Sequence, residues 1–350
     1  MTRVFVTRAL PGGSGPGSPL ARLRDAVDEV DVWEDEAPPS PAALLARSED
    51  CDGLLSMLTE RVDAALLDAR PGLRVVANMA VGYDNVDVPA CSARGVLVTN
   101  TPGVLTDATA DMTWALLLAA ARRLPEGRAA IEAGEWGPWH PSWLLGSAVT
   151  GRTLGIVGPG RIGAAVARRA QGFQMRVLYS GRSAKADFPG EFVPLDDLLA
   201  RSDFVSIHVP LTEATRGMCD ASFFARMQPH AVFVNTARGP VVDQGALTDA
   251  LRADLIAGAG LDVMTPEPLP PDHPLLHAPR LVLAPHLGSA TLETRTQMAH
   301  LAVDGLLAAL TGERPVHLLN PDALTPDTRE PDALDVTAAT NDTARRRGRP

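Results

Sequence analysis

The stretch TLGIVGPGRIGAAVARRA, residues 153–170, most constrains what this chain can fold into. An apolar, strand-like run is followed by a glycine-rich turn and then by a helix-forming run. The turn fits the pattern G-x-G-x-x-G at Gly158, Gly160 and Gly163. In this pattern the first glycine permits a tight turn, the second a close approach of a pyrophosphate, and the third close packing of the helix on the strand. We therefore expect a parallel α/β sheet with a dinucleotide-binding turn.

The residues after the next predicted strand indicate which dinucleotide binds. That strand ends about 20 residues past the turn, where an Asp or Glu commonly holds the adenosine ribose. This chain has Ser180, Arg182 and Ser183 there instead. An arginine can pair with a 2′-phosphate through two charge-assisted hydrogen bonds, whereas a carboxylate would repel it. We expect NADP(H) to be preferred and NAD(H) to be possible, with phosphate-binding amides at Arg161 and Ile162.

Short apolar runs alternate with helical patterns along most of the chain, which is typical of parallel sheets with crossover helices. The predicted strands cover residues 4–7, 53–57, 73–79, 96–100, 153–157, 175–179, 203–207, 231–235, 256–261 and 281–284. Long helices are predicted over residues 106–123 and 290–310. From Asn320 the chain is rich in Pro, Asp, Thr and Ala, and this composition predicts a disordered tail over residues 320–350.

Charge and cysteine content argue against several classes of protein. The net charge of −10 disfavours a general nucleic-acid-binding or anionic-membrane surface. The three cysteines, Cys51, Cys91 and Cys219, are far apart and match neither a disulfide framework nor a metal-binding pattern. The N-terminus lacks a signal-peptide core, and the longest obvious apolar run, residues 114–121, is too short to span a bilayer. We expect a cytoplasmic protein that binds no metal, nucleic acid or membrane.

Chemically useful side chains follow three consecutive predicted strands of the second half. They are Arg238, then Asp262 and Glu267, then His286. Ligands of open parallel sheets bind at the carboxyl ends of the strands. Arg238 can bind a carboxylate and polarise the neighbouring carbonyl, His286 can give that carbonyl a proton, and Glu267 can fix the imidazole tautomer. Singly, each could be a structural ion pair, a loop charge or a helix cap; together they favour keto-acid reduction with a nicotinamide cofactor. His208, which also ends a strand, is expected to be structural or cofactor-lining.

Five motifs together resemble the D-isomer-specific 2-hydroxyacid dehydrogenases. They are GPGRIG, HVPLT, NTARG, GLDVMTPEP and PHLGSAT, in that family's order and spacing, and the likeness extends to about residue 319. Within the family the chain is most similar to the glyoxylate/hydroxypyruvate reductases, through VLTDATAD, RRLPE, WGPWHPSW, YSGRS and TPEPLPPDHPLL. The resemblance implies two Rossmann-like domains. A discontinuous, flavodoxin-like substrate domain would contain residues 1–103 and 290–319, and an NAD(P)-binding domain would contain residues 104–289.

The resemblance also implies roles for individual residues. Arg238, Glu267 and His286 match the catalytic Arg, Glu and His, and Asp262 matches the residue that orients the nicotinamide carboxamide. Further contacts to the cofactor are implied at Thr106, Val209, Pro210, Thr215, Thr236, Ala237, Gly288 and Ser289. The implied substrate pocket contains Ser56, Leu58 and the backbone amides of Val81 and Gly82, besides Arg238 and His286.

The family is dimeric, which implies a homodimer. Trp139, in the WGPWHPSW segment, matches a tryptophan that reaches into the partner's active site, although a packed aromatic loop is the alternative. The implied activity is NADPH-preferring reduction of glyoxylate and hydroxypyruvate to D-2-hydroxy acids. An NAD-dependent D-2-hydroxyacid or phosphoglycerate dehydrogenase is the nearest rival. A dinucleotide-sensing, corepressor-like binding protein and a flavin-binding protein are alternatives of other classes.

Overall fold

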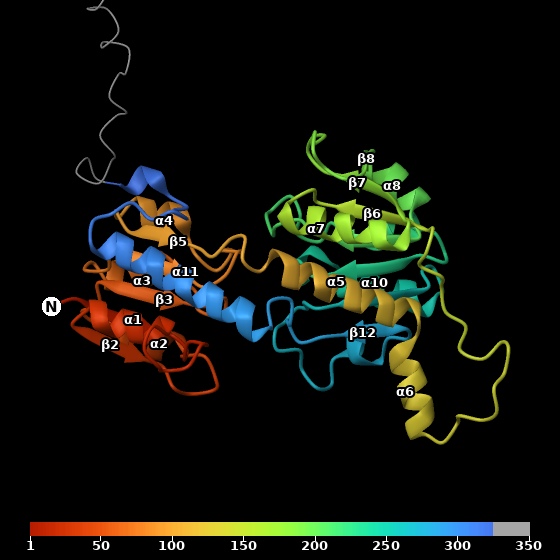
Figure 1. The fold of residues 1–350 in the computed structure, drawn as a ribbon, viewed down its shortest axis with the longest axis horizontal. Helices are drawn as coiled ribbons and strands as arrows, with labels where there is room; N and C mark the ends of the chain where they lie inside the picture. Colours follow the sequence, from red (N-terminus) through yellow and green to blue (C-terminus); the bar gives the residue numbers. More distant parts are fainter. Residues whose placement is uncertain (325–350) are drawn as a thin grey trace, which may run out of the picture.

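The computed structural model describes residues 1–324, which form two parallel sheets flanked by helices (Figure 1). The predicted α/β class is confirmed. The smaller sheet has the strand order β2-β1-β3-β4-β5, the order of flavodoxin-like folds. Its strands are β1 (Arg3–Val6), β2 (Glu29–Val32), β3 (Gly53–Ser56), β4 (Val75–Asn78) and β5 (Leu97–Thr99).

The larger sheet has seven parallel strands in the order β12-β11-β10-β9-β6-β7-β8. They are β6 (Thr153–Val157), β7 (Arg176–Ser180), β8 (Glu191–Phe192), β9 (Phe204–Ile207), β10 (Val232–Asn235), β11 (Gly258–Leu261) and β12 (Leu281–Leu283). The chain turns from one half of the sheet to the other between β6 and β9. A crevice opens at the carboxyl ends of strands at such a switch point, and dinucleotides bind there in this topology.

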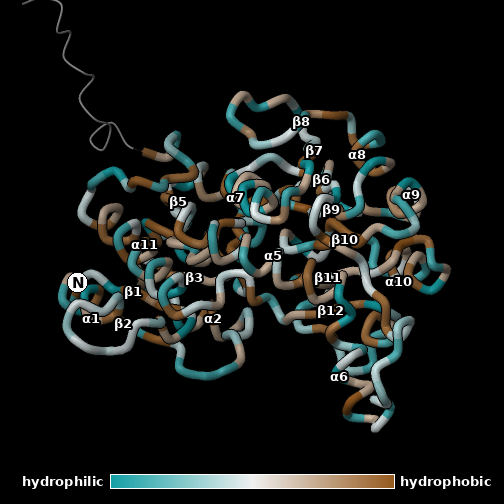
Figure 2. The backbone as a smooth tube through the Cα atoms, turned by 45° about the vertical axis from the view of Figure 1, so that its right-hand side comes forward, coloured by the Kyte–Doolittle hydropathy of each residue, from teal (hydrophilic) through white to brown (hydrophobic). Residues whose placement is uncertain are grey.

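Helices cover both faces of each sheet, and Figure 2 shows hydrophobic segments along the strands and hydrophilic ones in the outer loops. They are α1 (Pro19–Ala26), α2 (Pro41–Arg47), α3 (Ala64–Ala69), α4 (Val88–Ser92), α5 (Thr106–Ala121), α6 (Leu124–Glu132), α7 (Arg161–Ala170), α8 (Leu195–Arg201), α9 (Ala221–Ala225), α10 (Gln244–Arg252) and α11 (Leu292–Leu310). Among the helices of residues 1–324, none has both the length and the apolarity needed to cross a bilayer.

The chain crosses between the two sheets at α5 and α11. Helix α5 follows the smaller sheet in sequence but packs on β10, β11 and α7 of the larger one. Helix α11 follows the larger sheet but packs on α1, β3 and β4 of the smaller one (Figure 1). Its buried Met298, Ala302 and Leu306 join the core of that sheet. This arrangement agrees with a discontinuous substrate domain, while the exact domain boundaries remain a prediction.

The prediction of a disordered tail from Asn320 is wrong for residues 320–324, which pack on the smaller sheet. Asn320 is buried, its Oδ1 accepts from the Val98 amide at 2.8 Å, and its Nδ2 donates to the Val96 carbonyl at 2.8 Å. Strand β5 lies at the edge of its sheet, so its unpaired backbone groups are free to take these bonds. Ala323 and Leu324 then pack into the same core. The remainder of the predicted tail, residues 325–350, lies outside the described residues.

Candidate active site

A cleft of about 1510 Å³ lies where the carboxyl ends of the two sheets face each other. The smaller sheet lines it with the loops after β1, β3, β4 and β5. The larger sheet lines it with the loops after β6, β9, β10, β11 and β12. Since both sheets supply loops, a ligand in this cleft contacts residues of both sheets.

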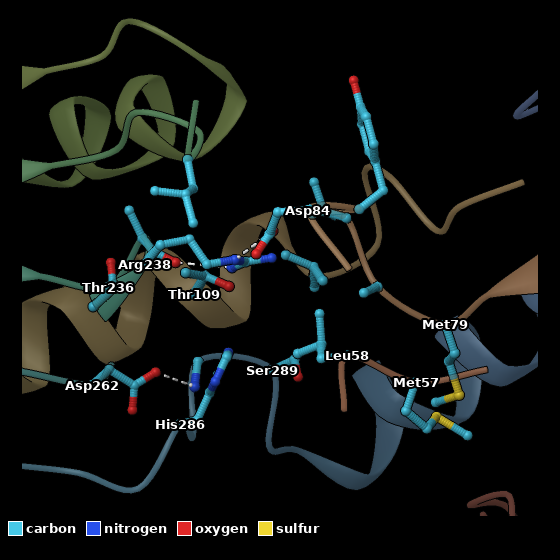
Figure 3. A pocket seen from close by; sticks show the side chains of 18 of the residues that line it. Met57, Leu58, Met79, Asp84, Thr109, Thr236, Arg238, Asp262, His286 and Ser289 are labelled. Carbon is cyan, nitrogen blue, oxygen red and sulfur yellow. Dashed lines mark hydrogen bonds and ion pairs between the residues drawn. The ribbon is translucent and has the colours of Figure 1, made fainter. Parts of the chain in front are cut away.

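Most of the predicted site residues line this cleft. They are Leu58, Val81, Gly82, Thr106, Gly160, Arg161, Ile162, Val209, Pro210, Thr236, Ala237, Arg238, Asp262, Glu267, His286, Gly288 and Ser289. Residues far apart in sequence are thus brought together, as Figure 3 shows for Leu58, Arg238 and His286. Within the described part of the chain, no group of three or more His, Cys, Asp or Glu side chains is arranged to hold a metal ion.

The glycine-rich turn has the geometry that a dinucleotide requires. Gly158 has a φ of +103°, and a side chain there would collide with the backbone of His208. Gly163 packs on the Gly158 carbonyl just as closely. Helix α7 then begins at Arg161 without a side-chain cap, so its first amides are left for an external acceptor. The turn therefore fits a pyrophosphate.

His286 and Glu267 form a hydrogen-bonded pair in the cleft. Nδ1 of His286 lies 2.8 Å from Oε2 of Glu267, and the other Glu267 oxygen accepts from the Met264 amide at 2.9 Å. Burial acts to raise the pKa of Glu267, but the hydrogen bond and charge of His286 outweigh it and hold that pKa below its ordinary value. The carboxylate therefore fixes the proton on Nδ1 and leaves Nε2 for a group in the cleft.

The backbone of His286 is strained, and Asp262 holds it in place. His286 has a φ of +55°, a left-handed conformation that is uncommon outside glycine and often found at functional sites. Its amide donates to the Asp262 carbonyl at 2.8 Å. Both carboxylate oxygens of Asp262 accept backbone amides, from Leu287 and Gly288, at 2.7 Å. Burial raises the pKa of Asp262, and these two amides partly oppose that effect.

Arg238 meets an aspartate that the sequence analysis did not single out. Its Nε donates to Oδ1 of Asp84 at 2.9 Å (Figure 3). Its Nη1 donates to the Ala237 carbonyl at 2.8 Å. Its Nη2 lies directly against Gly82, where any side chain would collide with it. The guanidinium is therefore aimed at the loop whose amides are predicted to bind the substrate carboxylate.

His208 is uncharged at neutral pH. Burial lowers its pKa to about 3, and its Nε2 lies 2.8 Å from the Ser206 hydroxyl. The ring lines the cleft beside Val209 and Pro210. This placement agrees with a structural or cofactor-lining role, as the sequence suggested.

Ser56 corrects an expectation about the substrate pocket. It is fully buried at the end of β3, its hydroxyl donates to Asn78 at 3.5 Å, and it does not line the cleft. Ser56 is the last residue of β3 and lies inside the fold, whereas Leu58 belongs to the loop that follows the strand and reaches the cleft. Thr215 also lies outside the lining; its hydroxyl donates to the Pro210 carbonyl at 2.6 Å and shapes that loop.

The residues predicted to contact the adenosine ribose stand at the end of β7. Ser180 is buried, and its carbonyl accepts from the Gly158 amide at 3.0 Å. Arg182 and Ser183 are exposed. Among residues 1–324, Arg182 makes no ion pair or hydrogen bond with another side chain, so its guanidinium is available to a ligand.

Comparison with known proteins assigns the chain to a family. The model of the D-isomer specific 2-hydroxyacid dehydrogenase NAD binding domain matches residues 114–288. The chain belongs to the D-isomer specific 2-hydroxyacid dehydrogenases. As a member of that family it is an oxidoreductase that acts on CH–OH donors with a nicotinamide dinucleotide.

Relatives in this family are similar over nearly their whole length. A glyoxylate reductase of Korarchaeum cryptofilum is 52% identical over 91% of this chain and 96% of its own. One of Thermococcus onnurineus is 49% identical over 92% of this chain and 97% of its own. The crystal structure of a Thermus thermophilus protein has a TM-score of 0.85 at 48% identity, covering 91% of this chain and all of that one.

A solved relative carries a bound dinucleotide. It is the NADPH-dependent glyoxylate/hydroxypyruvate reductase of Sinorhizobium meliloti, in complex with NADP and malonate. Its TM-score to this chain is 0.79 at 34% identity, and the match covers 94% of this chain and 99% of that one. The 2-hydroxyacid dehydrogenase fold of this chain therefore has a close counterpart among experimental structures.

Proposed function

We propose that this dehydrogenase reduces glyoxylate and hydroxypyruvate to the corresponding D-2-hydroxy acids and prefers NADPH to NADH. The observation that carries the proposal is that Arg238 and the Glu267–His286 pair line one cleft beside the glycine-rich turn. The names of the relatives support the choice of substrate, because several are glyoxylate reductases. The NADPH-dependent Sinorhizobium meliloti reductase supports the choice of cofactor.

The substrate carboxylate binds at the loop after β4 in this proposal. The amides of Val81 and Gly82 donate to it, and the Arg238 guanidinium, which lies against Gly82, adds a positive charge. The keto oxygen then lies within reach of Arg238, whose charge polarises the carbonyl and favours the negative charge that develops on its oxygen. Leu58, on the facing loop, closes the apolar side of the pocket.

His286 gives the proton that the product hydroxyl needs. Bound NADPH supplies the hydride to the carbonyl carbon. Nε2 of His286 donates its proton to the carbonyl oxygen, because Nδ1 is already engaged by Glu267. The hydrogen bond to Glu267 holds the ring in one orientation, with Nε2 free to face the carbonyl oxygen.

The cofactor is expected along the carboxyl ends of β6, β7 and β9. The amides of Arg161 and Ile162 would hold the pyrophosphate, while Arg182 and Ser183 would hold the 2′-phosphate. The other predicted contacts are Thr106, Val209, Pro210, Thr236, Ala237, Asp262, Gly288 and Ser289, with Thr215 acting through the shape of its loop.

A second copy of the chain is proposed to cover the segment after α6. Figure 1 shows this segment extending away from both sheets. It exposes Trp136, Trp139 and Trp143 by 67%, 86% and 41%. Exposed aromatic clusters of this kind are typical of interfaces. Trp139 would then reach the partner's cleft, and the chain would work as a homodimer.

We also propose that the protein is located in the cytoplasm.

The proposal is tested by following reduced-nicotinamide absorbance with glyoxylate and with hydroxypyruvate, each with NADPH and with NADH. Fast oxidation of NADPH and slow oxidation of NADH is the expected result. Activity with NADH alone would remove the cofactor preference and favour an NAD-dependent D-2-hydroxyacid dehydrogenase. No oxidation with either keto acid would remove the substrate assignment.

A further inference from the structure

Two buried asparagines hold the loop after β4 from beneath the cleft. Asn100 Nδ2 donates to the Val81 carbonyl, and Asn78 Nδ2 donates to the Gly82 carbonyl, each at 2.9 Å. Asn78 is fully buried, Asn100 is 7% exposed, and neither lines the cleft. Both carbonyls therefore point away from the cleft, toward the interior of the smaller sheet.

The direction of these carbonyls fixes the direction of the amides that follow them. In a trans peptide the N–H points opposite to the C=O, so the amides of Gly82 and Tyr83 point toward the cleft. The Ala80 carbonyl is held in the same way by the Thr101 amide at 2.8 Å, which turns the Val81 amide to that side too. Among the described residues, none of these three amides has a hydrogen-bond acceptor.

Successive backbone N–H groups that point to one side form a concavity that binds anions. A carboxylate offers about four lone-pair sites, enough for three amides and one guanidinium. We propose that Asn78 and Asn100 are positioning residues that hold Val81, Gly82 and Tyr83 as a three-amide site for the substrate carboxylate. This inference rests on the proposed function. It adds the Tyr83 amide to the site and assigns a task to two side chains that never touch the substrate.

The inference is tested by carboxylate selectivity. Asn78→Ala and Asn100→Ala would be assayed with glyoxylate and with its methyl ester, which keeps the carbonyl but has no charge. The kcat/KM for glyoxylate should fall about 10-fold, mainly through KM, while that for the ester changes by less than about twofold. Asn100→Asp keeps the side-chain shape and replaces the donor by an acceptor, so it should show the same loss of selectivity if an alanine variant fails to fold.

Asn320→Ala provides a matched control. Asn320 is also buried and also bonds to backbone groups of the smaller sheet, at Val96 and Val98, but it lies away from the cleft. Its replacement should lower the melting temperature and leave the ratio of glyoxylate to ester activity unchanged. Equal losses for both substrates in the Asn78 and Asn100 variants, or an unchanged ratio, would show a merely structural role and overturn the inference.

Calorimetric titration of oxalate into the NADPH-loaded protein separates this inference from the proposed function. Wild-type protein should bind oxalate, and the Asn78 and Asn100 variants should bind it about 10-fold more weakly. Tight oxalate binding by the variants would overturn the inference and leave the proposed function standing. A wild-type protein that neither reduces glyoxylate nor binds oxalate would overturn both.

Discussion

Asp84, in the loop after β4, accepts a hydrogen bond from Arg238, in the loop after β10: Nε of Arg238 lies 2.9 Å from Oδ1 of Asp84. The two side chains are only 35% and 20% exposed, so water screens their interaction less than at an open surface. If Arg238 binds the substrate carboxylate as proposed, Asp84 has two opposing effects on that anionic substrate. It orients the guanidinium, which helps to bind a carboxylate, and it offsets part of the positive charge that attracts one.

Two substitutions of Asp84 separate these effects. Asp84→Asn keeps an oxygen acceptor for Nε and removes the negative charge, so the KM for glyoxylate should fall about twofold to fivefold. Asp84→Ala removes the acceptor as well, and the freed guanidinium should lower kcat/KM about 10-fold. Steady-state kinetics at saturating NADPH measure both. The same change in both variants would contradict a separate orienting role for Asp84.

His286→Asn should remove the proton donor without relaxing the backbone. Asparagine tolerates a left-handed conformation better than most residues, so the strained turn should persist. We expect kcat for glyoxylate reduction to fall about 10² to 10⁴-fold. The dissociation constant of NADPH, measured by fluorescence titration, should stay at the wild-type value. Turnover close to wild type would rule out His286 as the donor.

Arg182→Ala should change the choice between the two dinucleotides. The KM for NADPH should rise about 10-fold or more because a charge-assisted pair with the 2′-phosphate is lost. The KM for NADH should be nearly unchanged, since that cofactor has no 2′-phosphate. Initial rates at fixed glyoxylate and varied cofactor measure both constants. Equal increases for NADPH and NADH would exclude a role in 2′-phosphate binding.

His208 should make stability depend on pH in the acidic range. Its pKa is lowered by burial from 6.5 to about 3, so between these values the unfolded chain binds a proton that the folded chain does not. Stability therefore falls as the pH drops through that window. His208→Gln should weaken the decrease of the melting temperature between pH 7 and pH 4.5, while His140→Gln in an exposed loop is the control. An unchanged decrease in the His208 variant would disprove the assignment.

The glycine-rich turn and the residues at the strand ends could be predicted because their signals are local in sequence. Gly158 stands between a strand and a helix, and His286 directly follows a strand, so position alone indicates where each lies. Asp84 was missed because its importance comes from Arg238, more than a hundred residues away on the other sheet. The only sequence signal was an acidic residue two positions after Gly82.

The sequence analysis did not predict the two edge strands or the role of the two buried asparagines, for different physical reasons. Strands β2 and β8 lie at sheet edges and carry exposed or half-exposed side chains, so they lack a strong apolar pattern. Asn78 and Asn100 are polar residues inside or beside apolar strands. The role of each asparagine depends on the backbone carbonyl to which its side chain donates, and the sequence alone does not show which carbonyl that is.

The crossing of the chain through α11 has a consequence for biosynthesis. The larger sheet and its helices come from one continuous stretch, so that unit can fold as soon as it has left the ribosome. The smaller sheet is made first but must wait, because α11 and Asn320 are among the last described segments to be synthesised. Until then the nascent chain exposes Leu55, Val75 and Ala77, the apolar face that α11 later covers. The part of the protein that is synthesised first is thus the last to complete its core.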